Sequence, residues 1–162
     1  MEETRQHGEE SDHLIQLVTF KIGHEEFGVD ILKVQEIIRM LAITKVPNAP
    51  AFVEGVINLR GKVIPVIDMR RRFGMAGAAH DSHTRVMVMD LQGQIIGFVV
   101  DAVSEVLRIQ ESTVEPPPAV VAGIGSEYMR GVGKLEDRLL ILLDLDKLLT
   151  EQEMEHLAET RG

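Results

Sequence analysis

The chain lacks several residue types, and each absence narrows its possible chemistry. It contains no cysteine, which excludes disulfide bonds, thiolate metal sites and cysteine nucleophiles and is typical of a reducing compartment. It also contains no tryptophan, and aromatic residues make up only 4% of it, so valine, isoleucine, leucine and methionine must fill the core. Such branched residues favour β-sheet over helix.

Long apolar runs and an excess of positive charge are absent as well. The longest apolar run, Leu139 to Leu143, is far too short to span a membrane, and the polar start of the chain does not resemble a signal peptide. The formal net charge of −9 disfavours nucleic acid and anionic lipid as partners. We therefore expect a cytoplasmic protein, and 162 residues correspond to one domain.

The apolar pattern predicts a disordered tail over residues 1–13, a folded domain over 14–149 and a C-terminal helix or tail over 150–162. Alternation predicts strands within that domain over residues 14–20, 27–30, 52–59, 62–67, 84–90 and 94–100. The spacing of Ile31, Val34, Ile37 and Ile38 instead predicts a short helix over 31–39. Asp68 is expected to cap another over 68–73, and a polar linker follows over 74–82.

An internal duplication organises the domain. Gly28 and the segment 34–39 match Gly97 and the segment 103–108, which lie 69 positions later, and Gly55 matches Gly131, which lies 76 positions later. Two approximate copies, 14–74 and 84–149, are therefore expected. Each has about five short strands, and closing each copy into its own small barrel would remove exposed strand edges. A terminal helix over residues 145–156 is expected to cover exposed core.

Few residues point to catalysis or metal binding. His80 and His83 lie in the polar linker, which offers no preorganised metal cage, so loop histidines are the favoured interpretation. Asp68 and Asp144 hold equivalent places, yet each directly follows an apolar strand, which favours helix capping over acid–base chemistry.

Further features of the sequence bear on ligand and partner binding. No complete phosphate-binding loop occurs, so we expect no nucleotide binding and no cofactor. The glycines of 131–133 fit a β-bulge better than a fragment of such a loop. The basic run 70–72 is expected to be a solvated helix face, with a partner contact as the alternative. Arg60 stands out because a long cation contributes nothing to the hairpin turn where it lies.

The segment Phe52 to Gly61 (FVEGVINLRG), followed by Ile64 to Asp68 (IPVID), closely resembles the signature of the CheW family. The segment Phe27 to Ile37 (FGVDILKVQEI) resembles it too, and the likeness extends over residues 14–149. The resemblance implies a mainly β fold of two SH3-like five-stranded barrels. It also implies a non-enzymatic adaptor in bacterial chemotaxis, which couples the cytoplasmic tip of methyl-accepting chemoreceptors to the regulatory domain of the histidine kinase CheA. The protein would then reach the membrane only indirectly, through receptors.

The resemblance also implies two sets of contact residues. Receptor contact is implied for Val34, Glu36, Asn58, Arg60 and Val106. Kinase contact is implied for the barrel ends, for which the candidates are Gly55, Val56, Gly131 and Val132. No catalytic residue, metal ligand or nucleic-acid partner is implied.

Two other classes of protein remain as alternatives. An enzyme or small-ligand barrel would need polar groups converging in a cavity, and no such constellation is evident in the sequence. A regulatory domain cut from a kinase is disfavoured because the chain lacks a phosphotransfer histidine region and an ATP-binding domain.

Overall fold

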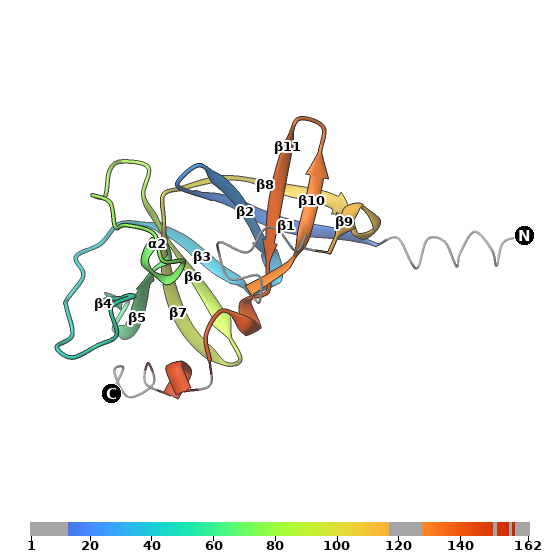
Figure 1. Cartoon of the computed structure of the whole chain (residues 1–162). Helices are drawn as coiled ribbons and strands as arrows, with labels where there is room; N and C mark the ends of the chain where they lie inside the picture. Colours follow the sequence, from blue (N-terminus) through green and yellow to red (C-terminus); the bar gives the residue numbers. More distant parts are fainter. Residues whose placement is uncertain (1–12, 117–127, 151, 156, 158–162) are drawn as a thin grey trace, which may run out of the picture.

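The computed structural model describes residues 13–116, 128–150, 152–155 and 157, and it confirms a mainly β fold with two sheets (Figure 1). Nearly all of the predicted disordered tail lies outside the described residues. The six strands of the first sheet are, in spatial order, β8 (Ala102–Gln110), β1 (Leu14–Ile22), β2 (Glu25–Asp30), β11 (Arg138–Leu143), β10 (Met129–Leu135) and β9 (Val114–Glu115). The five strands of the second sheet are, in order, β3 (Val34–Arg39), β6 (Arg85–Leu91), β7 (Gln94–Val100), β5 (Lys62–Asp68) and β4 (Val53–Leu59).

Helices are short throughout the described part of the chain. Single turns connect or follow strands at η1 (Ile31–Lys33), α2 (Met69–Arg72), η2 (Glu111–Thr113) and η4 (Leu145–Lys147). A last helical segment covers residues 152–155 and 157. None of the described helices is long and apolar enough to cross a membrane.

The two sequence copies exchange strands, so the prediction that each copy closes into its own barrel was wrong. In the first sheet, Gly28 of β2 lies opposite Leu142 of β11 in a parallel pair. In the second sheet, the equivalent positions meet the other way round, with Gly97 of β7 opposite Val66 of β5. Because the two copies carry the same apolar pattern, a strand pairs as well with the other copy as with its own.

Each sheet closes into a barrel because the segment that follows one edge strand pairs with the strand at the opposite edge. In the second sheet, Thr44 follows β3 and exchanges backbone hydrogen bonds of 2.9 and 2.8 Å with Val56 of β4. In the first sheet, β9 follows β8 and pairs with β10, so that Val114 lies opposite Gly133. Closure leaves most of the apolar side chains inside and, among the described residues, no long unpaired strand edge.

The region predicted as a helix over 31–39 is mostly strand. Only η1 is helical, and it begins after Asp30, whose side chain accepts a hydrogen bond from the Leu32 amide. Val34 to Arg39 then forms β3, in which a β-bulge shifts the register between Val34 and Glu36. The bulge interrupts the two-residue alternation, and the resulting apolar spacing imitates that of a helix.

The two predicted helix caps are confirmed. The Asp68 carboxylate accepts a hydrogen bond from the Arg70 amide at 3.0 Å, and the Asp144 carboxylate accepts one from the Asp146 amide at 3.1 Å. The expected bulge also lies at Gly131, where the register of β10 and β11 shifts.

The core is largest where the two sheets meet. Phe20, Phe27 and Phe73 stack there, with ring centroids 5.8 and 5.3 Å apart. The C-terminal segment covers this core, as predicted, because Leu148 and Leu157 are buried in it. It does so through two short helical segments rather than the single predicted helix, and His156 lies outside the described residues.

Candidate functional site

An ion pair between Glu36 and Arg60 lies at one end of the second barrel. Glu36 is on β3, and Arg60 lies in the turn between β4 and β5, so the pair joins residues 24 positions apart. Both terminal nitrogens of Arg60 donate to the Glu36 carboxylate, one of them at 3.2 Å. The Arg60 side chain is nevertheless 70% exposed, against 29% for Glu36, so the guanidinium remains accessible to a partner.

The β4–β5 turn positions Arg60. Arg60 and Gly61 both have positive φ, 52° and 85°, which is the geometry of a tight two-residue hairpin turn. The Asn58 side chain accepts a hydrogen bond from the Gly61 amide at 2.8 Å and so stabilises the turn. Asn58, predicted as a receptor contact, therefore also has a structural role.

A shallow hollow of about 220 Å³ adjoins the ion pair. Its lining combines charged and apolar residues, namely Gln35, Glu36, Leu59, Arg60, Lys62, Ile64, Val88 and Ile95. Of these residues, the sequence predicted only Glu36 and Arg60 as contacts and missed Gln35, Leu59, Lys62, Ile64, Val88 and Ile95. Lys62 could have been found because it directly follows the turn.

The ion pair shifts the titration of both partners. Side-chain hydrogen bonds from Arg60 lower the pKa of Glu36, against a smaller opposing effect of burial. The hydrogen bonds to Glu36 in turn raise the pKa of Arg60. The pair is thus fully charged at neutral pH and weakens only when acid protonates Glu36.

The two predicted apolar receptor contacts lie on different sheets. Val34 begins β3 and is partly buried against the large core cluster. Val106 lies on β8 of the first sheet, opposite Val18, and is 54% exposed. The structure therefore places Val34 on the same strand as Glu36 and Val106 on the other barrel.

Three of the four candidate kinase contacts are buried. Gly55, Gly131 and Val132 have little surface to offer a partner, whereas Val56 is half-buried. A Cβ at Gly55 would lie 2.2 Å from the Thr44 carbonyl oxygen, and one at Gly131 would lie 2.7 Å from the Glu115 carbonyl oxygen. Each glycine therefore leaves room for the segment that closes its barrel. The burial of Gly55, Gly131 and Val132 does not support direct kinase contact through them.

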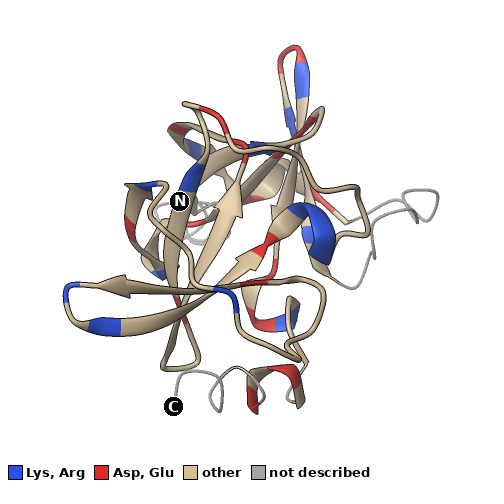
Figure 2. Ribbon diagram, turned by 90° about the vertical axis from the view of Figure 1, so that its left-hand side faces the viewer, with Lys and Arg blue, Asp and Glu red and all other residues tan. Residues whose placement is uncertain are grey.

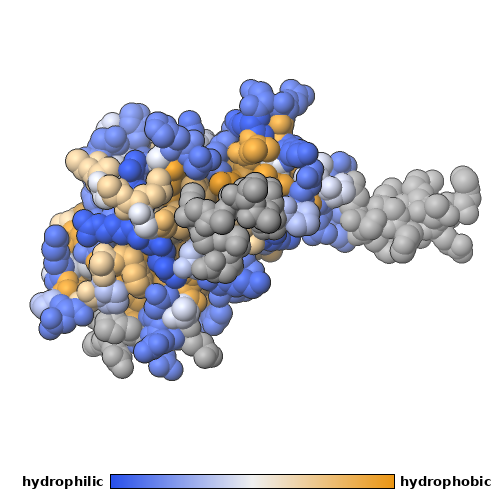
Figure 3. Space-filling model, in the orientation of Figure 1, coloured by the Kyte–Doolittle hydropathy of each residue, from blue (hydrophilic) through white to orange (hydrophobic). Residues whose placement is uncertain are grey.

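Exposed apolar side chains lie on the strands beside those glycines. Val63 of β5 is 46% exposed, and its equivalent on β11, Leu139, is 61% exposed. Figure 3 shows apolar surface over β11 in the region of the β10–β11 hairpin. Both residues lie on strands that pair with the strands of the predicted kinase contacts.

The basic run 70–72 is not the solvated face that was predicted. Figure 2 shows α2 as a basic turn, and each of its arginines has an acidic partner. Arg72 is only 13% exposed, and its guanidinium lies 5.2 Å from the Phe52 ring centroid and 4.8 Å from that of Tyr128. This arginine links the two halves of the chain.

The linker histidines form simple pairs. His80 lies 3.2 Å from the Glu54 carboxylate, and His83 lies 3.7 Å from that of Asp81. Within the described ranges, no group of three or more histidine or acidic side chains is arranged to hold a metal ion.

Two small barrels that present an accessible ion pair and exposed apolar residues define a protein-binding scaffold. The comparisons with known proteins agree with this class. The family model of the CheW-like domain matches residues 16–153, and the chain belongs to this family.

Several relatives cover most of the chain. A chemotaxis protein CheW of Klebsiella aerogenes is 42% identical over 139 residues, which is 86% of this chain and 84% of the relative. Another, of Treponema pallidum, is 36% identical over 91% of this chain and 89% of the relative. The crystal structure of the scaffolding protein TtCheW from Thermoanaerobacter tengcongensis matches with a TM-score of 0.79 and 38% identity, covering 87% of this chain and 91% of that one. The chain is thus a chemotaxis protein of the scaffold type.

Proposed function

We propose that this chain is a non-enzymatic adaptor that couples the cytoplasmic tip of chemoreceptors to the histidine kinase CheA. The observation that carries the proposal is the exposed Glu36–Arg60 pair, which presents an arginine at a hairpin tip beside a hollow. The chemotaxis names of its relatives and the scaffolding role named for its structural neighbour support the same function. In this role the protein acts in the cytoplasm and reaches the membrane only through receptors.

Receptor contact involves Arg60 directly in this proposal. A receptor tip is a helical hairpin, with carbonyl and carboxylate oxygens at its turn, by family resemblance. The planar guanidinium can donate to several oxygens at once, and arginine is enriched among residues that dominate binding energy. Glu36 holds the guanidinium in place and leaves it exposed, while Val34 and Val106 supply apolar contact.

Kinase contact involves the apolar strands that flank Gly55 and Gly131. Val63 and Leu139 are exposed on these strands and are equivalent residues of the two copies. They lie on different barrels, so the molecule has two similar but non-identical ends. Each end can pair with a barrel of the kinase regulatory domain. Head-to-tail contacts of this kind close into rings when the rotation per step permits it.

Reversing the charge of Arg60 tests the proposal. Arg60→Glu removes the surface pair with Glu36 and places two carboxylates side by side, yet because Arg60 is exposed it should change the free energy of unfolding by no more than about 1 kcal/mol. Loss of a well-placed arginine costs on the order of 2 kcal/mol of binding, or about thirtyfold in affinity, and repulsion should add to this. Calorimetric titration with a soluble receptor fragment measures the loss, and melting temperature reports the fold.

Kinase binding serves as the control for the same variant. Arg60→Glu should bind CheA normally but fail to place it under receptor control. Unchanged receptor affinity would remove Arg60 from the site. Lost affinity together with a large fall in melting temperature would make its role structural.

A further inference from the structure

Two arginines face each other at the ends of β3 and β6. Arg39 lies directly opposite Arg85 in the antiparallel pair, and like charges at such positions destabilise a sheet. Arg85 donates to the carbonyl oxygens of Ser82 and Thr84, each at 2.9 Å, so its guanidinium is held in place. In the described part of the chain, neither arginine forms an ion pair with a carboxylate.

The other barrel shows what this position looks like without the charge conflict. Its equivalent residues are Gln16 and Arg108, each 69 positions from its counterpart, and they lie opposite each other in β1 and β8. A glutamine there is compatible with the same fold and the same strand pairing. Arg85, the counterpart of Gln16, is therefore not required to build the barrel, and its charge needs another explanation.

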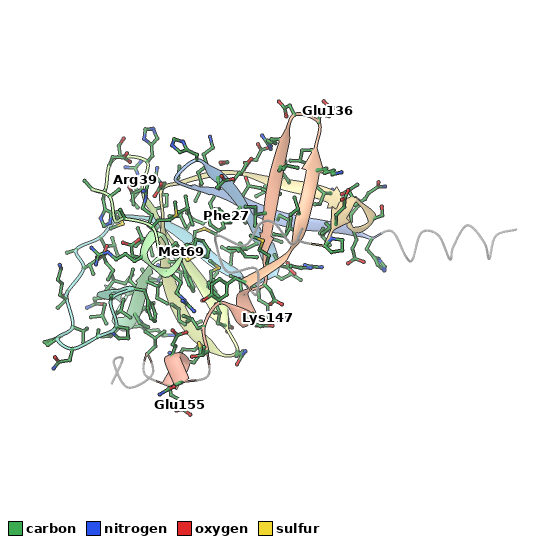
Figure 4. The ribbon with its side chains drawn as sticks, viewed as in Figure 1. Phe27, Arg39, Met69, Glu136, Lys147 and Glu155 are labelled. Atoms are coloured by element: carbon green, nitrogen blue, oxygen red, sulfur yellow. The ribbon has the colours of Figure 1, made fainter. Side chains whose placement is uncertain are left out.

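The arginine pair lines a surface hollow of about 360 Å³. The hollow is bounded by Arg39, Met40, Asp81, Ser82, Thr84 and Arg85. Met40 also lines a neighbouring hollow of about 230 Å³, whose other lining residues are Leu41, Ile43, Lys45, Glu54 and His80. Figure 4 places Arg39 at the edge of the molecule, far from Lys147 and Glu155.

The charges of the hollow suit a carboxylate better than a phosphate. Two guanidinium groups can each bind a carboxylate in bidentate fashion. The Asp81 carboxylate lies in the same hollow, where it accepts a hydrogen bond from the His83 amide at 2.8 Å. It would repel a dianion more strongly than a single carboxylate, and the apolar surface at Met40 and Leu41 favours a side chain of similar character beside the acid.

We propose that Arg39 and Arg85 form a docking site for an acidic segment of a partner protein, in which a glutamate or aspartate is flanked by apolar residues. The partner carboxylate binds between the two guanidinium groups and relieves their repulsion. Its apolar neighbours pack on Met40 and Leu41.

This docking site is distinct from the proposed receptor contact. The hollow beside the Glu36–Arg60 pair shares no lining residue with the hollow at Arg39 and Arg85. Glu36 and Arg39 also differ in exposure along β3, where partly buried and exposed residues alternate. Failure of either proposal therefore leaves the other intact.

A matched pair of peptides tests the site on the full chain. The probe is acetyl-Leu-Glu-Leu-amide, and its control is acetyl-Leu-Gln-Leu-amide, which removes only the charge. Titration followed by nuclear magnetic resonance should shift the side-chain Nε signals of Arg39 and Arg85 saturably with the glutamate peptide. The glutamine peptide should bind at least about tenfold more weakly, because charge-assisted hydrogen bonds are lost.

Two variants separate binding from folding. Arg85→Gln reproduces the glutamine of the other barrel. It should lower the affinity for the glutamate peptide at least about tenfold without lowering the melting temperature. Arg108→Gln, the control on the other barrel, should leave the affinity unchanged. Equal affinity for the two peptides, no saturable shift with the glutamate peptide, or an unaffected Arg85→Gln would overturn the proposal.

Two other occupants are tested in the same assay. Inorganic phosphate should bind more weakly than the glutamate peptide, and tighter phosphate binding would refute the carboxylate assignment. Neutralising Glu9, Glu10 and Asp12 of the full chain to glutamine or asparagine should not change peptide affinity. A gain in affinity would show that the chain's own acidic segment occupies the site, which would also contradict a partner segment.

Discussion

Each barrel pairs an equivalent glutamate, Glu36 or Glu105, with an arginine of its hairpin, but the two arginines lie at different positions. In the second barrel, Glu36 pairs with Arg60 at the tip of the β4–β5 hairpin. In the first barrel, the equivalent Glu105 pairs with Arg138 at 3.3 Å. Arg138 lies just past the tip of the β10–β11 hairpin, whose turn carries Glu136 in place of an arginine, and Figure 2 shows the acidic colour of this tip.

The difference shows how one duplicated fold acquires two different ends. Arg138 is shared between Glu105 and Glu26, which lies 3.2 Å away, so its charge is neutralised within the molecule. Arg60 has one carboxylate partner and remains largely exposed. The backbone repeats, while the residues at the hairpin tips determine which end can present a positive charge to a partner.

The largest effect is expected from the glycines at which each barrel closes. A Cβ at Gly55 would clash with the Thr44 backbone at a φ of +152°, so Gly55→Ala should lower the free energy of unfolding by about 3 kcal/mol. Gly131→Ala, which clashes without a positive φ, should cost about 2 kcal/mol. Urea denaturation measures both.

Gly93→Ala is the control for these two variants. Gly93 has a φ of +87° and open space around its Cβ position, so its cost should stay near 1 kcal/mol. If all three variants were equally stable, Gly55 and Gly131 would not be needed for the close approach of the segments that close the barrels.

The contact between the halves at Arg72 should give the next largest effect. Arg72 lies near the rings of Phe52 and Tyr128, which are equivalent residues of the two copies, and donates to the Leu148 carbonyl oxygen at 3.1 Å. Arg72→Ala should cost about 2 kcal/mol in urea denaturation, because it removes these contacts from a largely buried position. The neighbouring Arg71→Ala, on a more exposed surface pair, should cost less than about 0.5 kcal/mol, and a similar cost for both would argue against the link.

A smaller effect is expected at Asp101, whose equivalent in the first copy is the exposed Leu32. Burial would raise the pKa of Asp101, but hydrogen bonds from the Arg70 guanidinium and the Gly23 amide outweigh it, and the pKa is lowered overall. Asp101→Asn should therefore cost about 1 kcal/mol at pH 7.

The loss of stability in Asp101→Asn should depend on pH and should become smaller in acid. A carboxylate with a lowered pKa in the folded state stabilises the protein above the unfolded-state pKa, here near 3.8, and this stabilisation is lost as the pH falls through the folded-state pKa. Melting temperatures of the native chain and the variant should thus converge in acid. A difference in melting temperature that does not shrink as the pH falls below about 3.8 and further into acid would contradict the assigned cause.

The sequence predicted β1, β2, β4, β5, β6 and β7, the hairpin turn at Arg60 and Gly61, and both caps, because each of these depends on local residues. It could not show that strands are exchanged, since Gly28 and Gly97 meet equivalent partners whether a copy pairs with itself or with the other. It also misled at β3, where the bulge between Val34 and Glu36 gave the apolar residues a helical spacing.

The candidate site was predicted in part. Glu36 and Arg60 came from resemblance to a family, and the structure joins them by an ion pair. The structural role of Gly55 and Gly131 was missed because it depends on Thr44 and Glu115, which are distant in sequence or belong to another strand.

The central claim is that the exposed arginine of the second barrel, and not its neutralised counterpart, contacts the receptor. Calorimetric titration of a soluble receptor fragment into Arg60→Ala and Arg138→Ala tests it directly. The account predicts a loss of about thirtyfold for Arg60→Ala and less than about twofold for Arg138→Ala, with both variants folded by melting temperature. Equal losses in the two variants, or full affinity in Arg60→Ala, would contradict it.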